Sequence, residues 1–477
     1  MNSSSNDLPL RSPAETPLPV QTTGSFRSLR IALVISELEA GGAEKNFVNL
    51  AVGLQQRGHR VFVFSLDPRP EPGRDLLVRR LEQASIPLSF SQRSWSGWPS
   101  RVQVAGLQQF FRENSVEIAS SFLFRANLAT CLAARKTRQP TDAGPSPLPA
   151  VLGLRQAEPR FFVRELEKWC LQRSHATVCV SRQVAQHYLG KRPLHPLDSV
   201  DATRRGQVLV IPNGVARPAA PPDVPPDVPP DLAACFGEPV VPKFGDSLPV
   251  LLFVGRLTHQ KGVDELLALS PKLLGLLPGF RLVLLGHGPL EKALRRQAAA
   301  LDCRDRIHFL GWRPNPSSYI QASAMVLLHS RWEGQPNAIL EAMSAGKPFV
   351  STETHGVADI FSPDTPENRP PAALELAGHP AETSGPRGTS GIEGLDQASA
   401  GNPVIDRSLA RQSQVVAAQD PQAYITAITN LARDPKIAKN IGLWNQNHVE
   451  NHFSIAQFVS AHEQVFLKLA RARQHST

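Results

Sequence analysis

The sequence predicts an α/β protein made of two Rossmann-like domains that face each other across a cleft. Three observations lead to this prediction. The chain has 477 residues, which is too long for one ordinary hydrophobic core. A pattern of strand, loop, helix and strand occurs near its start, and a second α/β pattern begins after a proline-rich interruption. We therefore expect two parallel sheets that bind ligands at the carboxyl ends of their strands.

The first α/β pattern begins with the apolar stretch RIALVIS, residues 30–36, which predicts a buried strand. A loop containing Gly41 and Gly42 follows, and an amphipathic stretch that ends at Gly58 predicts a helix. The stretch RVFVFS, residues 60–65, predicts the next strand, which completes a βαβ unit. Further strands of this domain are predicted near Ile118, Val178 and Leu209.

The amino-acid composition predicts where the two domains are separated. The segment from Ala216 to Lys243 is rich in proline and small residues, so we expect an extended linker that contains neither a helix nor a central strand. A later stretch rich in Pro, Gly, Ser, Ala and Glu predicts a disordered insert in the second domain. The predicted boundaries are 1–28 for a disordered tail, 29–215 for the N-terminal domain, 216–248 for the linker, 249–442 for the C-terminal domain with its insert 364–403, and 443–477 for a helical segment that crosses back to the N-terminal domain.

Positive charge is concentrated in the first half of the chain. The whole protein carries a formal net charge of +9, and residues 1–215 contain 27 basic and 17 acidic residues, so 27 − 17 = +10 falls there. This excess suits an anionic partner such as a phosphorylated lipid headgroup or an anionic membrane surface. No zinc-finger spacing or basic helix with heptads is present, so we expect no nucleic-acid partner.

Cysteine usage and hydropathy predict the compartment. The five cysteines are odd in number and widely spaced, without a Cys-x-x-Cys pair, so neither a disulfide framework nor a zinc site is expected. No apolar run approaches the roughly 18 residues that cross a bilayer. We expect a cytoplasmic protein that is at most peripheral to the inner face of the cytoplasmic membrane.

Two glutamates stand out in RWEGQPNAILEAMSAGKP, residues 331–348. Pro336 is predicted to be the first residue of a short helix and Gly346 its left-handed stop. Glu341 is the only ionisable residue within that helix, and a vicinal diol would offer two donors to its carboxylate. Glu333 precedes the helix, and Gly334 would let a ligand approach the backbone. A solvated Glu341 on an exposed face is the alternative.

These residues resemble a known family. The pattern E-G-x-P-N-A-x-L-E-A-M-S-A-G-K-P is similar to the two-glutamate signature of retaining glycosyltransferases of the GT-B fold, family 4. Further stretches resemble the same family in the expected order, from about Leu29 to Leu469: ISELEAGGAEKNFVNLA, ATVCVSRQVAQHY, VIPNGV, FVGRLTHQKGVDELL, LVLLGHGPLEKAL and IHFLGW.

The resemblance implies a role for each matching residue. Arg256 and Lys261 would bind the diphosphate of a nucleotide diphosphate-sugar donor. Glu333 would hold the hydroxyls of the donor sugar. These three residues are the expected catalytic residues. Glu341 would bind the ribose diol. The other implied donor-binding residues are Gly41, Gly42, Gly286, Gly288, Gly311, Trp312, Arg313, Gly334, Pro336 and Asn337.

The sequence lacks the Asp-x-Asp motif of metal-dependent transferases. Cationic side chains and helix dipoles are therefore expected to stabilise the departing diphosphate, and we expect no cofactor and no required metal.

One stretch departs from the family pattern. Many members carry a histidine where this chain has Phe122, after Ser120 and Ser121. Phenylalanine cannot hold a proton, so an enzymatic base at that point is not expected. The candidate contacts for a hydroxyl acceptor, either a glycan or a lipid-linked glycan, are Arg125, Asn127 and Arg155.

The implied function is retaining transfer of a sugar from a nucleotide diphosphate-sugar to a hydroxyl acceptor, in cell-surface polysaccharide or lipid-linked glycan synthesis. Two alternatives stay open. A nucleotide-sugar 2-epimerase has a related two-domain fold, and a non-catalytic sugar-nucleotide-binding protein is compatible with Phe122.

Overall fold

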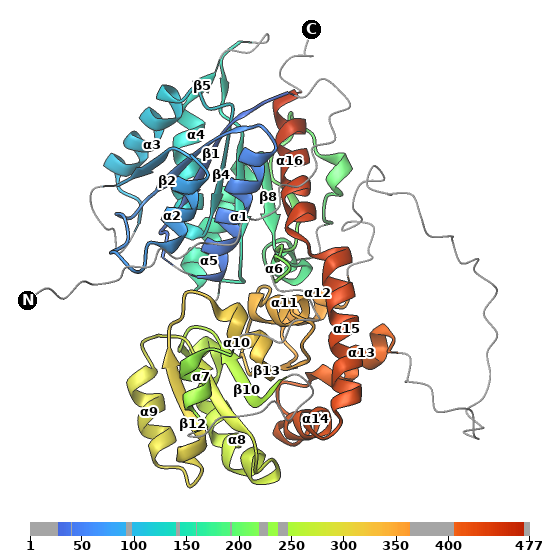
Figure 1. Cartoon of the computed structure of the whole chain (residues 1–477). Coiled ribbons are helices and arrows are strands. Elements are labelled where there is room, and N and C mark those ends of the chain that lie inside the picture. Colours follow the sequence, from blue (N-terminus) through green and yellow to red (C-terminus); the bar gives the residue numbers. More distant parts are fainter. Residues whose placement is uncertain are drawn as a thin grey trace, which may run out of the picture.

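A computed structural model describes residues 27–39, 41–91, 98–139, 144–158, 160–190, 193–218, 228–236, 247–362 and 405–471. Two α/β domains lie one above the other in Figure 1, and the last helix returns to the first domain. The predicted insert 364–403, nearly all of the predicted tail 1–28 and most of the predicted linker lie outside the described residues.

The N-terminal domain contains a seven-stranded parallel sheet with the order β3-β2-β1-β4-β7-β8-β9. Its strands are β1 (Arg30–Ile35), β2 (Arg60–Ser65), β3 (Leu88–Phe90), β4 (Ile118–Phe122), β7 (Ala150–Leu154), β8 (Ala176–Cys179) and β9 (Gln207–Val210). Its helices are α1 (Gly42–Gln56), α2 (Leu76–Gln83), α3 (Arg101–Glu113), α4 (Phe124–Lys136), α5 (Phe161–Arg173) and α6 (Arg182–Leu189). A short antiparallel pair, β5 (Arg138–Gln139) and β6 (Ser146–Pro147), lies apart from this sheet.

The unbroken apolar run of β1 is explained by burial on both faces of the sheet. Successive residues of a strand point to opposite faces. Ile31, Leu33 and Ile35 belong to one core cluster, and Ala32 and Val34 belong to another. A parallel sheet that is covered on both faces therefore needs apolar residues at consecutive positions.

The C-terminal domain contains a six-stranded parallel sheet with the order β12-β11-β10-β13-β14-β15. Its strands are β10 (Leu248–Val254), β11 (Arg281–Leu285), β12 (Ile307–Gly311), β13 (Ser323–Leu328), β14 (Phe349–Thr352) and β15 (Val415–Val416). Its helices are α7 (Pro230–Ala234), the 3-10 helix η2 (His259–Lys261), α8 (Val263–Leu276), α9 (Glu291–Ala299), α10 (Pro316–Ala322), α11 (Asn337–Ser344), α12 (His355–Ile360), α13 (Arg407–Gln414), α14 (Pro421–Arg433) and α15 (Pro435–His452). The predicted fold class, two Rossmann-like α/β domains, is confirmed.

The predicted linker contains a helix, so the expectation of a helix-free segment is wrong. Helix α7 begins at Pro230, a position where proline is tolerated because the first helical N–H has no partner inside the helix. Leu232 is fully buried in the core of the C-terminal domain. Asp231 accepts hydrogen bonds from Arg313 and Tyr319. These contacts fix α7 to the C-terminal domain.

The chain crosses back between its last two helices. Helix α15 packs against α11 of the C-terminal domain, and α16 (Ile455–Arg471) packs against α1 of the N-terminal domain, as Figure 1 shows. Phe458 and Phe466 of α16 are buried in the same core cluster as β1. The crossing point lies near Phe453, so the predicted boundary at residue 442 falls inside α15.

Within the residues that the structure describes, no helix combines the length and the apolar character that a membrane crossing requires.

Candidate functional site

The carboxyl ends of both parallel sheets lie at the junction of the two domains. The loop after β1 leads into α1, the loop after β10 leads into η2, and the loop after β13 leads into α11. This is the edge at which open α/β sheets bind ligands.

Lys261 and Glu333 form the centre of this region on the C-terminal domain. Lys261 Nζ donates to Glu333 Oε1 at 2.5 Å, and Ser330 Oγ donates to the same oxygen at 2.7 Å. The side chain of Glu333 is 7% exposed and that of Lys261 18%. The two predicted catalytic residues, 72 positions apart in the chain, are thus brought into direct contact.

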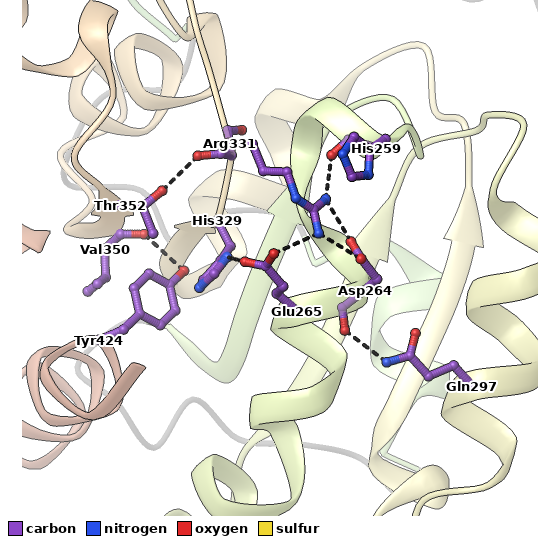
Figure 2. A network of polar contacts seen from close by, with 10 residues as sticks. His259, Asp264, Glu265, Gln297, His329, Arg331, Val350, Thr352 and Tyr424 are labelled. Carbon is purple, nitrogen blue, oxygen red and sulfur yellow. Dashed lines mark hydrogen bonds and ion pairs between the residues drawn. The ribbon is translucent and has the colours of Figure 1, made fainter. Parts of the chain in front are cut away.

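A network around Arg331 holds the Glu333 loop against the Lys261 loop (Figure 2). The Arg331 guanidinium donates to both carboxylate oxygens of Asp264, at 3.0 and 2.7 Å, and to Glu265 Oε1 at 2.7 Å. The hydrogen bond from Arg331 is the main cause that lowers the pKa of Asp264. Burial lowers the pKa of His329, so its ring beside Glu265 is neutral at neutral pH. The network ties the loop that carries Arg331 to η2 and to the first turn of α8.

Glu341 is paired rather than solvated. Its carboxylate accepts a hydrogen bond from Lys45 Nζ, which comes from the first turn of α1 in the other domain. Helix α11 begins at Asn337, and Pro336 is its N-cap. The sequence had predicted Pro336 as the first residue of this helix, so the observed start lies one residue later. Gly346 has φ 67°, the left-handed stop that the sequence predicted.

Asn337 joins the two domains. Its Nδ2 donates to the carbonyl oxygen of Gly42 at 2.8 Å, and its Oδ1 accepts from Asn46 and Asn213 at 3.2 and 3.0 Å. Gln335 Oε1 accepts from the backbone N–H of Asn213 at 2.6 Å. We call this set of contacts, Gly42, Asn46, Asn213, Gln335 and Asn337, the interdomain seam.

Arg256 reaches toward two carboxylates of the N-terminal domain. Arg256 Nη2 lies 3.7 Å from Glu37 Oε1 and 3.8 Å from Glu44 Oε1. Burial raises the pKa of Glu44 to about 7, and the Arg256 charge opposes that rise. A side chain at Gly41 would overlap the Glu44 carboxyl, since a Cβ there would lie 2.1 Å from Glu44 Oε2.

The predicted glycines serve backbone packing. A Cβ on Gly286 would lie 1.8 Å from the carbonyl oxygen of Gly255, and one on Gly288 would lie 2.4 Å from that of Leu257. Both glycines therefore pack against the loop that carries Arg256. A Cβ on Gly334 would lie 2.0 Å from the carbonyl oxygen of Arg155. The sequence predicted that a ligand approaches Gly334, and in this structure the backbone of the first domain does so.

The residues at the two ends of the segment from Gly311 to Arg313 have different surroundings. Gly311 accepts a hydrogen bond from the backbone N–H of Gly286, which places it beside the other predicted donor-binding glycines. Trp312 follows β12 directly. The Arg313 side chain instead pairs with Asp231 of α7 at 2.7 Å, so its guanidinium serves packing within the domain.

Two of the three acceptor candidates are engaged inside the N-terminal domain. Arg125 donates to both oxygens of Asp67, at 2.9 and 2.7 Å. Asn127 is buried, and its amide is bonded to Ser121 and to Gly153, which argues against its predicted contact with an acceptor. An amide that is hydrogen-bonded in the core cannot turn outward without leaving buried polar groups unpaired.

Arg155 is the acceptor candidate that reaches the seam. Its Nη1 donates to Asn213 Oδ1 at 3.2 Å. Its guanidinium carbon lies 3.4 Å from the centroid of the buried Phe122 ring. The position where many members carry histidine thus holds an aromatic ring in contact with an arginine.

Several buried polar atoms at this edge lack hydrogen-bond partners within the described part of the chain. They are Ser36 Oγ, Asn46 Oδ1, Arg155 Nε and Nη2, Gln335 Nε2 and Thr354 Oγ1. Each such atom costs about 1–3 kcal/mol when it stays unpaired. Both domains contribute to the set, so a polar ligand or water is expected between them. Across the described ranges, no cluster of three His, Cys, Asp or Glu side chains suited to a metal ion occurs.

Sequence reasoning gave no role to Asn46, Asn213 and Gln335 of the seam, nor to the charged residues Glu44 and Lys45 beside it. Glu44, Lys45 and Asn46 lie in AGGAEKNF, and Asn213 lies in VIPNGV. Both stretches contribute to the family resemblance, but only Gly41 and Gly42 were given roles. Their signal was the occurrence of several polar side chains at the carboxyl end of a predicted strand.

Two family models match the chain. Residues 239–368 match the model for glycosyl transferases group 1, and residues 40–217 match the model for glycosyltransferase family 4. The matched ranges contain the Lys261 and Glu333 loops in one case and the Gly41 loop with Arg155 and Asn213 in the other.

Curated relatives match over short segments. An uncharacterized glycosyltransferase of Methanocaldococcus jannaschii is 33% identical over 122 residues, which are 25% of this chain and 30% of that protein. The UDP-Gal:alpha-D-GlcNAc-diphosphoundecaprenol alpha-1,3-galactosyltransferase of Escherichia coli is 33% identical over 110 residues, which are 22% of this chain and 28% of that protein. The aligned segments thus span less than a third of either relative.

Solved structures match over nearly the whole chain. The structure of Anabaena HepE in complex with UDP and glucose has a TM-score of 0.63 at 17% identity, over 91% of this chain and 98% of that one. A glycosyltransferase from Rickettsia africae has a TM-score of 0.63 at 15% identity, over 93% and 99% of the two chains. At such low identity, these matches show that the fold is shared.

Proposed function

This chain belongs to the GT-B glycosyltransferases of family 4, and from that premise we propose that it transfers a sugar from a nucleoside diphosphate-sugar to a hydroxyl acceptor with retention of configuration. The contact between Lys261 and Glu333 at the carboxyl edge of the second sheet carries the proposal. It places a cation for the diphosphate beside a carboxylate for the hydroxyls of the sugar. Arg256 supplies a second cation nearby, on the loop that follows β10.

The proposed reaction uses these groups for electrostatic stabilisation. The bond between the anomeric carbon and the diphosphate oxygen breaks, and the acceptor oxygen bonds to that carbon on the same face. The acceptor proton passes to the leaving diphosphate. Lys261 and Arg256 stabilise the negative charge that develops on the diphosphate, a kind of interaction worth about 3–4 kcal/mol per group in other enzymes. Phe122 takes no part in proton transfer.

Donor binding requires rearrangement at the junction. Glu341 is proposed to bind the ribose diol, but its carboxylate is paired with Lys45. Arg256 is proposed to bind the diphosphate, but it faces Glu37 and Glu44. Glu341 and Arg256 are therefore each paired with oppositely charged side chains of the N-terminal domain. A bound donor must replace these ion pairs.

A panel of UDP-glucose, ADP-glucose, GDP-mannose and CMP-sialic acid tests donor binding by thermal unfolding. We expect a nucleoside diphosphate-sugar at a hundred times its dissociation constant to stabilise the protein by about 2.7 kcal/mol. The nucleoside monophosphate-sugar serves as the matched control and should give a smaller shift. Absence of a shift with every diphosphate-sugar would overturn the proposed function, and interconversion of the bound sugar without any acceptor would identify an epimerase.

We further propose that the acceptor is a lipid-linked glycan and that the N-terminal domain contacts an anionic membrane. The name of the Escherichia coli relative specifies a sugar linked to diphosphoundecaprenol. Trp98, Val102, Phe161 and Phe162 are exposed large hydrophobic residues of this domain, and Phe162 is 80% exposed. They lie at the N-terminal ends of α3 and α5, which both pack against α4.

Two arginines lie beside the α5 part of this surface, and each is paired with a glutamate, Arg160 with Glu158 and Arg164 with Glu165. Arg160 precedes α5 and its side chain is 70% exposed, and the Arg164 guanidinium lies 5.4 Å from the Phe161 ring. The Trp98 ring packs on Phe124 at 5.8 Å between centroids. Aromatic rings beside cations suit the interface of an anionic bilayer.

Sedimentation with vesicles containing phosphatidylglycerol tests this surface. We expect retention of the protein at low salt and loss of retention at high salt. Changing both Phe161 and Phe162 to serine should weaken the partition about a hundredfold, because burial of each ring contributes about 1.5 kcal/mol or more. The control is Leu443→Ser on α15, where Leu443 is 50% exposed in the other domain. Equal retention of both variants and the wild type would contradict the assignment of this surface.

A further inference from the structure

Arg155 is a partly buried cation whose guanidinium has an unused hydrogen-bonding edge. It follows β7, and its Nη1 donates to Asn213 Oδ1 at 3.2 Å. Nε and Nη2 have no hydrogen-bond partner among the described residues. Nε and Nη2 lie on the same edge of the planar guanidinium and form the fork that binds a carboxylate or phosphate through two parallel bonds.

The described groups that pack against the Arg155 guanidinium are aromatic or neutral. Its guanidinium stacks on Phe122 and lies 6.0 Å from the centroid of Phe458. Burial, with a smaller contribution from the Arg155 charge, lowers the pKa of the adjacent His462 to about 3, so this ring is neutral. Within the described ranges, no carboxylate forms an ion pair with Arg155. Burial lowers the pKa of Arg155 itself to about 9, which keeps it charged at neutral pH.

An isolated buried cation is costly. Taking one charged group out of water without a partner costs several kcal/mol. Arg125, in the same domain, shows the usual solution, since both its terminal nitrogens donate to Asp67. The energetic cost at Arg155 is explained if the missing partner is a ligand that is absent from the free protein.

We propose that Arg155 is a binding site for an oxyanion, a phosphate or carboxylate of the ligand that enters between the domains. Its carbonyl oxygen packs against Gly334, and its partner Asn213 bonds to Gln335 and Asn337. Separation of the two domains at the seam would therefore expose the guanidinium, and closure would enclose the bound anion. This inference rests on the proposed function in one respect: the oxyanion is assumed to be part of either the sugar donor or the acceptor.

The test compares Arg155→Met with wild type and with Arg125→Met, in thermal unfolding at constant ionic strength. The probes are inorganic pyrophosphate, inorganic phosphate and glucuronate, each against chloride. We expect the wild type and Arg125→Met to be stabilised by at least one oxyanion, and we expect Arg155→Met to lose that shift. Without added anion, Arg155→Met should unfold at a higher temperature than wild type, because an unpaired buried charge is removed. Arg125→Met should unfold at a lower temperature, because Asp67 loses its partner.

Direct binding of UDP-glucose, ADP-glucose and GDP-mannose distinguishes the two sources of the anion. A tenfold or greater loss of affinity in Arg155→Met, with partial recovery in Arg155→Lys, assigns the anion to the donor diphosphate. Unchanged donor affinity together with a lost response to phosphate or glucuronate assigns it to the acceptor.

Two outcomes separate this inference from the proposed function. If Arg155→Met responds to every anion as the wild type does and binds the donor equally well, the oxyanion site is overturned while the glycosyltransferase proposal stands. If the wild type responds to oxyanions through Arg155 but binds no nucleoside diphosphate-sugar, the site stands and the proposed function is overturned.

Discussion

Lys261→Ala is expected to lower the rate of nucleoside diphosphate release from the donor by about a thousandfold, or about 4 kcal/mol of transition-state stabilisation. Lys261 Nζ lies 2.5 Å from Glu333 Oε1, on the loop where the second sheet would bind a diphosphate. Removing the ammonium takes away a charge that the leaving group needs and leaves Glu333 without its cation. The measurement is the steady-state release of the nucleoside diphosphate, with kcat and KM determined separately.

Lys272 provides the matched control for Lys261. It belongs to α8 of the same domain and its ammonium contacts Gln422, away from the junction. Lys272→Ala should keep the wild-type rate within a factor of about two, because surface substitutions of this kind usually change stability by no more than about 0.5 kcal/mol. If Lys261→Ala is folded and keeps more than a tenth of the wild-type rate, Lys261 does not stabilise the departing diphosphate.

Gly334→Ala is expected to reduce the same rate by at least about a hundredfold, by preventing the domains from meeting. A Cβ at this position would lie 2.0 Å from the carbonyl oxygen of Arg155 and 3.1 Å from Cα of Gln156. Both groups are backbone, so neither can swing aside. We expect the seam to open instead, which separates the two halves of the site and admits water.

Small-angle X-ray scattering in the presence of donor checks this expectation, since the Gly334→Ala protein should have a larger radius of gyration than the wild type. The control is Gly275→Ala in α8, where a Cβ would meet nothing within 4 Å. It should match the wild type in both scattering and rate. If Gly334→Ala matches them as well, closure at this contact is irrelevant to the reaction.

The fold could be predicted, and candidate catalytic residues could be named, because their signals are local. Apolar runs such as RIALVIS and the glycine loop after it predict a βαβ unit from neighbouring residues alone. The short helix with Glu341 was predicted within one residue at its start, because proline and glycine mark helix ends through their own backbone geometry. Lys261 and Glu333 were found through motifs that each lie within one loop.

Other side chains have partners that the sequence did not predict. Asn127 was chosen for its polar side chain, but its amide is bonded to Ser121 and Gly153 in the core. The segment from Gly311 to Arg313 was predicted to meet the base through its backbone, and the structure adds that the Arg313 guanidinium pairs with Asp231. That aspartate lies in a segment which composition alone predicted to be a linker. Each partner is distant in sequence, and a side chain's partner depends on packing that no local pattern contains.

By itself, the sequence determined that this chain forms two parallel α/β domains, that it resembles family 4 glycosyltransferases, and that Lys261, Arg256, Glu333 and Glu341 are the residues to test. Only the tertiary structure decided how the two domains meet: Lys45 faces Glu341, Asn337 bonds to Gly42, and Gly334 receives the backbone of Arg155. It also decided that the Arg155 guanidinium stacks on Phe122 while its Nε and Nη2 are buried without a hydrogen-bond partner in the described part of the chain. The physical reason is range, because backbone propensity and apolar periodicity act over a few residues, whereas ion pairs and burial depend on groups that folding brings together from opposite ends of the chain.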